Sequence, residues 1–174
     1  PERIVFTQNA THSLNTAIKG VLKYGSHAVI TSMEHNSVLR PVFSLARKKM
    51  ITYSVAPADR YGCVAAESIV NELKPSTALI VVTHASNVCG TVNDIYDIRR
   101  KTGDIPLLID ASQSAGLVKI DMKRLKKTIL AFPGHKGLYG PQGTGGLYIP
   151  EDMEVSPLTE GGTGSVSESP MQPQ

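Results

Sequence analysis

A single lysine stands among glycines in the stretch FPGHKGLYGPQGTGGLYI, residues 132–149. Lys136 follows an apolar run, and glycines occupy positions 134, 137, 140, 143, 145 and 146. Apolar surroundings disfavour an ammonium ion, and an amine that loses its proton near neutral pH becomes a nucleophile toward carbonyl carbon. Glycines also let the backbone approach a bound group closely. The segment therefore predicts a lysine that attacks a carbonyl compound or, more simply, a solvated loop lysine.

A carboxylate and an amide follow a short apolar segment in the same half of the chain. Asp110 closes the segment LLID, and Gln113 comes three residues later. Ligands of open α/β sheets bind beyond the carboxyl ends of the strands. A buried carboxylate is costly unless it faces a cation. We therefore expect Asp110 to contact a cationic ligand or to form a structural ion pair.

The segment TQNAT joins the apolar residues RIVF to an amphipathic stretch near the start of the chain. A helix that begins here presents free backbone N–H groups and the positive end of its dipole, which favours a bound phosphate. Simple capping of the helix by Asn9 or Thr11 explains the same residues. Both interpretations stay open at this point.

The lysine, the carboxylate and the helix start together match three chemical handles of pyridoxal 5′-phosphate. Lys136 would take the aldehyde, Asp110 the ring nitrogen, and the TQNAT segment the phosphate. This conjunction is more specific than any single member. The sequence therefore predicts pyridoxal phosphate as the cofactor.

These residues need a sheet that collects them at one edge. Period-2 and apolar runs predict strands at residues 3–6, 28–31, 51–55, 78–83, 107–110, 128–132 and 145–149. Helical periodicity predicts helices at 11–23, 37–49, 65–73 and 94–102, with Pro41 delaying or kinking the second. Several strands are apolar throughout, as strands covered on both faces are. The predicted fold class is α/β: a three-layer sandwich with a mostly parallel seven-stranded sheet and helices on both faces.

Length and composition fit one globular domain. The chain has 174 residues and a net charge of +3, and its densest basic run, MKRLKK, contains no aromatic residue that could stack bases. The lack of stacking residues in this run predicts no nucleic acid partner. We also expect no membrane association, because long apolar runs are absent. The two cysteines, Cys63 and Cys89, form neither a CxxC pair nor a disulfide framework, which favours a location in the reducing cytoplasm. Residues 1–150 form the predicted domain, and the Gly/Ser-rich residues 151–174 lead toward a C-terminal domain beyond the sequence.

Other site types find less support. No GxGxxG joins the first strand to its helix, and no GxxxxGK[ST] occurs, so the usual nucleotide cradles are missing. Residues 112–116, SQSAG, resemble a nucleophile elbow without its first glycine. No histidine pair has metal-ligand spacing, so we predict no metal site. A non-enzymatic dimerisation or assembly domain remains an alternative.

The motifs resemble a known family, in order and over nearly the whole chain. IVFTQNATHSLN, TSMEHNSV, VTHASNVCGT, LLIDASQSAG and FPGHKGLYGPQGTGGLYI resemble the class V aminotransferases of the fold-type I pyridoxal phosphate enzymes. They are most similar to the branch of cysteine desulfurases and selenocysteine lyases. The resemblance implies removal of sulfur or selenium from cysteine or selenocysteine to give alanine, a homodimer and a sulfur-acceptor protein. Aminotransferase or kynureninase-like lyase chemistry remains open.

The resemblance also implies residue roles around the cofactor ring. Lys136 would form the Schiff base with the cofactor and move a proton during catalysis. Asp110 would hold the ring nitrogen protonated, and His35 would stack on the ring face as the second catalytic residue. Gln113 and Asn87 would bind near the ring hydroxyl.

At the phosphate, the resemblance implies contacts from Thr11, the backbone N–H of Ala10, and His135. Thr163, in a GGT segment, would reach the phosphate of the neighbouring subunit. Pro133 departs from the family, because relatives commonly have a hydroxyl residue there that helps to hold phosphate. Ala10 also departs, since many relatives have threonine at that position.

Two functional groups of the family have no match within the chain. Relatives bind the substrate carboxylate through an arginine of the C-terminal domain, and desulfurases take the sulfur on a loop cysteine. Cys63 and Cys89 are not expected to be that cysteine, and filling space is the ordinary use of a free cysteine. The chain is therefore expected to be the cofactor domain of a larger enzyme.

Overall fold

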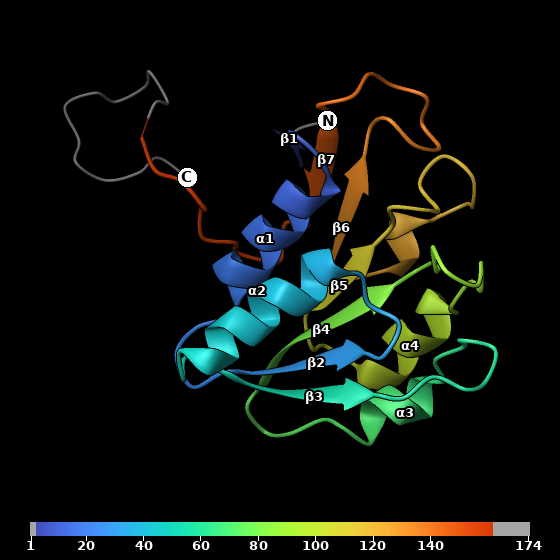
Figure 1. Ribbon diagram of the computed structural model, residues 1–174. Helices are drawn as coiled ribbons and strands as arrows, with labels where there is room; N and C mark the ends of the chain where they lie inside the picture. The colour runs from blue at the N-terminus through green and yellow to red at the C-terminus, as the bar shows by residue number, and fades with distance from the viewer. Residues whose placement is uncertain (1–2, 162–174) are drawn as a thin grey trace.

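A computed structural model describes residues 3–161, which form a single sheet between two layers of helices (Figure 1). The strands run in the order β1-β7-β6-β5-β4-β2-β3. Their bounds are β1 Ile4–Thr7, β2 His27–Thr31, β3 Thr52–Ala56, β4 Thr77–Thr83, β5 Leu107–Asp110, β6 Thr128–Pro133 and β7 Gly145–Tyr148. All seven predicted strands are present, each within two residues of its predicted bounds. The five strands from β6 to β3 are parallel, and β7 is antiparallel to both β6 and β1.

The predicted helices are also present. They are α1 Ala10–Val21, α2 Asn36–Arg47, α3 Ala66–Val70 and α4 Ile95–Thr102, with a short 3-10 helix η1 at Met122–Arg124 that the sequence did not predict. Of the two predicted effects of Pro41, the late start is wrong, because α2 begins at Asn36 and contains Pro41 as a buried interior residue. A kink at Pro41 stays a prediction. Helix α3 is four residues shorter than predicted and has no side-chain cap.

Alternate residues along the inner strands feed two separate cores, which explains why these strands are apolar on both sides. On one face α1 and α2 pack on a cluster that includes Ile30, Val81 and Leu108. On the other face α3 and α4 pack on a cluster that includes Ile80 and Ile109. Figure 1 shows the two helix pairs on opposite sides of the sheet. The predicted three-layer α/β class is confirmed.

The strand directions bring five strand ends to one edge of the sheet. Strands β2, β4, β5 and β6 are parallel, and β1 runs the same way because it is antiparallel to β7, which is antiparallel to β6. The residues that follow these strands therefore meet at the same edge, although they come from positions between 8 and 136 of the sequence. The fold thus brings polar residues that are distant in the sequence to the carboxyl ends of the strands, where open α/β sheets bind their ligands.

Two glycines hold the loop after β6 against the turn after β5. A Cβ on Gly116, which has a φ of +84°, would collide with the carbonyl of Gly137, and a Cβ on Gly137 would collide with the carbonyl of Ala115. This close approach needs glycine on both sides. It fixes the distance between the segment that carries Asp110 and the segment that carries Lys136.

The segment after β7 returns to the first core. Met153 and Val155 pack against the cluster beneath α1, and the Ser156 backbone N–H donates to the Gly20 carbonyl (3.2 Å). Among residues 3–161, no helix combines the length and the apolar character that crossing a bilayer would need.

His27 joins three strands from within the sheet. The side chain is fully buried, and its Nδ1 pairs with Thr77 Oγ1 (2.8 Å) while its Nε2 pairs with Ser54 Oγ (3.1 Å). Burial, and then the charge of Lys74, lower the pKa of His27. Burial also lowers the pKa of His84. In the folded protein both imidazoles therefore favour the neutral form more than a solvated histidine does.

We expect the contribution of His27 to stability to be lost on acidification below about pH 6.5, the usual pKa of histidine in an unfolded chain. The unfolded chain binds protons there more readily than the folded one, so the neutral form stabilises the fold above that pH and the gain is lost below it. Denaturant titrations at pH 5 to 8 should show a smaller pH slope for His27→Gln than for wild type. His84 keeps part of the slope in the variant. Equal slopes in both proteins would contradict this account of His27.

Candidate functional site

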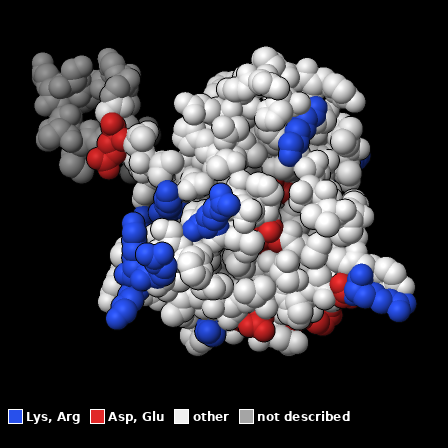
Figure 2. Space-filling model, in the orientation of Figure 1, with Lys and Arg blue, Asp and Glu red and all other residues white. Residues whose placement is uncertain are grey.

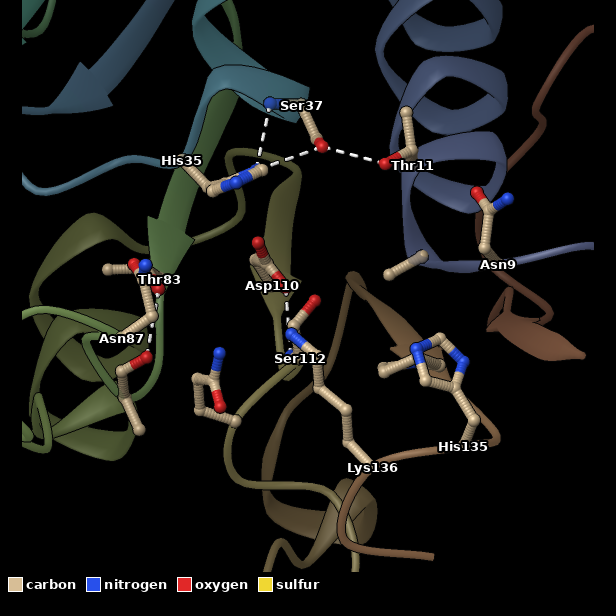
Figure 3. A pocket seen from close by; sticks show the side chains of 14 residues that line it. Asn9, Thr11, His35, Ser37, Thr83, Asn87, Asp110, Ser112, His135 and Lys136 are labelled. Atoms are coloured by element: carbon tan, nitrogen blue, oxygen red, sulfur yellow. Dashed lines mark hydrogen bonds between the residues drawn. The ribbon is translucent and has the colours of Figure 1, made fainter. Parts of the chain in front are cut away.

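A cavity of about 190 Å³ opens at the edge where the strand ends meet (Figure 3). It is lined by Asn9, Ala10, Thr11, His35, Ser37, Thr83, Ala85, Asn87, Asp110, Ser112, Gln113, Pro133, His135 and Lys136. All eight predicted site residues that the structure describes are among them. Thr163, the ninth, lies outside the described residues. The structure thus brings the predicted residues together, whatever their roles.

Asp110 is a buried carboxylate at the centre of this cavity. The residue is 3% exposed, and its Oδ1 accepts a hydrogen bond from the Ser112 backbone N–H (2.9 Å). The ion pairs among residues 3–161 lie at the surface, and none includes Asp110. The alternative of a structural ion pair therefore has no support in the described part of the chain. A buried carboxylate that faces a cavity favours a cationic or hydrogen-bond-donating ligand.

Lys136 extends from the loop after β6 into the same cavity, with its amine directed toward Asp110 and Ser112 (Figure 3). The residue is exposed. The expectation of apolar surroundings is therefore wrong at the side chain itself, because the glycine loop leaves it open to solvent. The reaction of Lys136 with a carbonyl compound stays a prediction. The contact between Gly116 and Gly137 nevertheless holds the loop of Lys136 against the turn that follows Asp110.

His35 lies on the opposite side of the cavity from Lys136 and begins α2 (Figure 3). Its Nδ1 accepts from the Ser37 backbone N–H (3.1 Å) and pairs with Ser37 Oγ (2.9 Å). Ser37 Oγ also pairs with Thr11 Oγ1 (2.8 Å). An Nδ1 that accepts a backbone N–H carries no proton, so the cap fixes both the tautomer and the ring orientation. The chain of bonds links α1 to α2 across the cavity.

The start of α1 lines the third side. Asn9 caps this helix, since its side chain accepts from the His12 backbone N–H (2.9 Å). The capping interpretation is therefore confirmed for Asn9, and the free N–H groups of the first turn remain available to an anion. His135 lies beside them (Figure 3). Pro133 lines the same region and contributes neither a hydroxyl nor an N–H.

Two amides border the remaining side. Gln113 is half-buried in the turn after β5, where the Ser114 and Ala115 N–H groups both donate to the Ala111 carbonyl. Ser114 also pairs with His84 Nδ1 (2.8 Å), which anchors this turn to the end of β4. Asn87 is exposed on the loop that follows.

Several lining residues were not identified from the sequence. Ser37, Thr83 and Ser112 are ordinary hydroxyl residues, and only their places in the first turn of α2, at the end of β4 and just after β5 could have indicated them. A second groove, of about 480 Å³, shares Thr11, His35 and Ser37 with the cavity and adds the cations Lys19 and Arg40. Lys and Arg side chains gather on this side of the molecule, over α1 and α2 (Figure 2).

Both cysteines are exposed, so the expectation that they fill space was wrong. Cys89 Sγ pairs with Thr91 Oγ1 (3.3 Å), and hydrogen bonds from Ser86 and Thr91 lower the pKa of the Cys89 thiol to about 7. Neither cysteine lines the cavity. Within residues 3–161, no three His, Cys, Asp or Glu side chains are grouped closely enough to hold a metal ion.

Comparison with known proteins gives matches over nearly the whole chain. A probable cysteine desulfurase of Methanothermobacter thermautotrophicus is 37% identical over 166 residues, which are 92% of this chain and 41% of that protein. The cysteine desulfurase IscS of Pseudomonas fluorescens is 40% identical over 162 residues, 89% of this chain and 39% of the relative. The chain therefore spans about 40% of the length of these curated relatives.

Solved structures agree with the sequence matches. A structure described as SspA in complex with cysteine aligns with a TM-score of 0.86 and 34% identity, covering 93% of this chain and 48% of that one. The apo cysteine desulfurase of Thermococcus onnurineus aligns with a TM-score of 0.78 and 35% identity, covering 86% and 38%. The resemblance inferred from the motifs is thereby confirmed.

The model of the aminotransferase class-V family matches residues 1–172. Because the family model covers nearly every residue and the fold is shared with these structures, the chain belongs to the aminotransferase class-V family.

Proposed function

We propose that this chain holds pyridoxal phosphate in the cavity between His35 and Lys136. One observation carries the proposal: Asp110 is buried, forms no ion pair with any residue of 3–161, and shares a cavity with a lysine amine. A protonated pyridine nitrogen supplies the cation that the carboxylate needs, and an aldehyde supplies the partner of the amine. The donor set therefore fits the two reactive ends of the cofactor.

The phosphate end fits the start of α1. Ala10 contributes a backbone N–H there, and the Thr11 hydroxyl and the His135 ring line the same side of the cavity. Lys19 and Arg40 in the adjoining groove add positive charge. Pro133 removes one hydroxyl contact, which these groups offset. We extend the proposal to Thr163 of a second copy of the chain, in a homodimer.

The bound cofactor would supply an electron sink that stabilises negative charge at the substrate Cα. Lys136 Nζ would then carry the proton to and from that carbon, because its amine is the only one among the lining residues. His35 would cover the ring face, with its orientation fixed by Ser37. Gln113 and Asn87 would donate hydrogen bonds near the ring hydroxyl.

For the whole protein we propose removal of sulfur from cysteine, or selenium from selenocysteine, to give alanine. The support is the identity to curated cysteine desulfurases and the likeness to a protein solved with cysteine. The cavity lining contains no arginine for a substrate carboxylate and no cysteine to take the sulfur. We therefore assign both groups to residues outside 3–161. The proposed setting is a reducing cytoplasm with a sulfur-acceptor protein as partner.

Lys136→Ala should abolish covalent cofactor attachment. Wild-type chain incubated with pyridoxal phosphate and then dialysed should retain visible absorbance at one cofactor per chain. Borohydride reduction followed by peptide mass spectrometry should find the pyridoxyl group on Lys136. The matched control is Lys123→Ala, an exposed lysine on η1, which should behave as wild type. Retained absorbance in Lys136→Ala, or a label on other lysines alone, would refute the assignment.

Asp110→Asn should weaken cofactor binding by about tenfold to hundredfold, because a hydrogen bond to a charged group contributes about 1.5–3 kcal/mol. Fluorescence or absorbance titration measures the dissociation constant. Asp152→Asn, at an exposed position, serves as the control and should leave the constant unchanged. Equal affinities for wild type and Asp110→Asn would show that this carboxylate does not contact the ring.

The loaded protein should form alanine from L-cysteine when a free thiol is present to take the sulfur as a persulfide. In that step the C–S bond of cysteine breaks, an S–S bond forms on the thiol, and alanine gains the hydrogen. Lys136→Ala should lower the rate by about 10²-fold or more. Transfer of the amino group to pyruvate would favour the aminotransferase alternative, and cleavage of kynurenine would favour the lyase. Cofactor binding without any turnover would support the alternative of an inactive dimerisation or assembly domain.

A further inference from the structure

A second carboxyl group lies buried beside the cavity and has no role in the proposed chemistry. Glu34 precedes His35 in the segment between β2 and α2 and is 6% exposed. Its Oε1 accepts from Thr31 Oγ1 (2.6 Å) and from the Thr83 backbone N–H (2.8 Å). Because the last backbone pair of β2 and β4 is Ile30 with Val81, the Glu34 side chain extends the connection between these strands beyond their ladder.

The other oxygen of this carboxyl faces the interior unpaired. Glu34 Oε2 is a buried side-chain atom without a hydrogen-bond partner among the described residues. An ionised carboxylate in that position would bury an uncompensated charge, which is costly. A protonated carboxyl avoids the charge and still lets Oε1 accept both hydrogen bonds.

The electrostatic surroundings act in the same direction. Burial raises the pKa of Glu34 to about 8, the charge of Asp110 adds to this, and the hydrogen bonds from Thr31 and Thr83 only partly offset it. The strand register explains why Asp110 lies near Glu34: Thr83, whose N–H bonds to Glu34, is paired with Asp110 between β4 and β5.

Within residues 3–161, the groups that shift the pKa of Glu34 include no cation. From β4, the His84 ring is directed to Ser114, and burial keeps its pKa low. From the start of α2, the His35 ring is directed to Ser37. From β5, the charge of Asp110 disfavours a second negative charge on Glu34. The described elements around Glu34 therefore supply one like charge and two imidazoles bonded elsewhere.

We propose that Glu34 is a positioning residue that works as a neutral acid: it ties β2 to β4, anchors the segment that carries His35, and leaves Asp110 as the sole anion in the cavity floor. This inference deepens the proposed function and, for its effect on cofactor binding, rests on it. Two neighbouring carboxyl groups would then have opposite protonation states near neutral pH, as pairs with divided roles have.

The effect on stability has a definite sign. The pKa of Glu34 is raised in the folded chain above its ordinary value, so the neutral form stabilises the fold fully at low pH. That contribution is lost as the pH rises toward and through about 8. Glutamine imitates the neutral acid, because its oxygen accepts as Oε1 does and it cannot ionise. Alanine removes the anchor altogether.

The test compares wild type, Glu34→Gln and Glu34→Ala, with Glu154→Gln as an exposed control. Between pH 6 and 9 the melting temperature of wild type should fall relative to that of Glu34→Gln by about 5 °C or more. The amide resonance of Thr83 in two-dimensional NMR should titrate in wild type with a midpoint near 8 and stay constant in Glu34→Gln. Parallel melting curves, or a Thr83 shift that is the same in both proteins, would overturn the proposal.

Cofactor affinity at pH 7 gives the second readout. Glu34→Gln should bind pyridoxal phosphate within about threefold of wild type, and Glu34→Ala should bind at least about tenfold more weakly, because the segment of His35 loses its anchor. A tenfold loss in Glu34→Gln would mean that the charge of Glu34 is needed and would refute the neutral acid. If no protein binds the cofactor, the proposed function fails, while the Thr83 titration in the cofactor-free chain still decides the state of Glu34.

Discussion

The carboxylate of Asp110, buried at the end of an inner strand, is the constraint on which the site depends. A parallel strand covered on both faces cannot end in an unpaired charge without a large cost, so the fold must supply a partner or leave room for one. The described residues leave room: the cavity lies directly over this residue, and Lys136 and His35 approach it from opposite sides. The residues that follow the other strand ends line the cavity around this carboxylate.

Rigidity around the cavity comes from backbone contacts more than from side-chain charges. The turn after β5 and the loop after β6 touch through glycine backbones, and α1 is joined to α2 through two hydroxyl groups and an imidazole. Such contacts cost little to form at the ends of packed elements and hold functional groups at set distances. The exposed position of Lys136 is compatible with this, because its loop is fixed even where its side chain is open to solvent.

Much of the fold and of the site could be predicted from the sequence, and the reasons are physical. Apolar runs such as LLID and ALIVVT identify inner strands, and polar residues directly after them must meet at one edge of a parallel sheet. Asp110 and Lys136 were found in this way. Ser37 and Glu34 were not, because their importance arises from partners far away in the sequence, Thr11 and Thr83. The exposure of Lys136 depends on tertiary packing that local composition does not encode, and Pro41 fits within α2 for the same reason.

The pairing of β1 with β7 sets an order on biosynthesis. Ile4 lies opposite Tyr148, so β1 has no neighbour in the described sheet until β7 has been translated and is in place. The turn at residues 8–11 is translated before β7, yet the strand before it has β7 as its sole neighbour in the described sheet. A nascent chain would therefore carry its aspartate, histidine and lysine before the anion-binding corner is fixed. Capture of a phosphorylated ligand at this corner therefore follows the synthesis of β7, whose long-range pairing with β1 completes the edge.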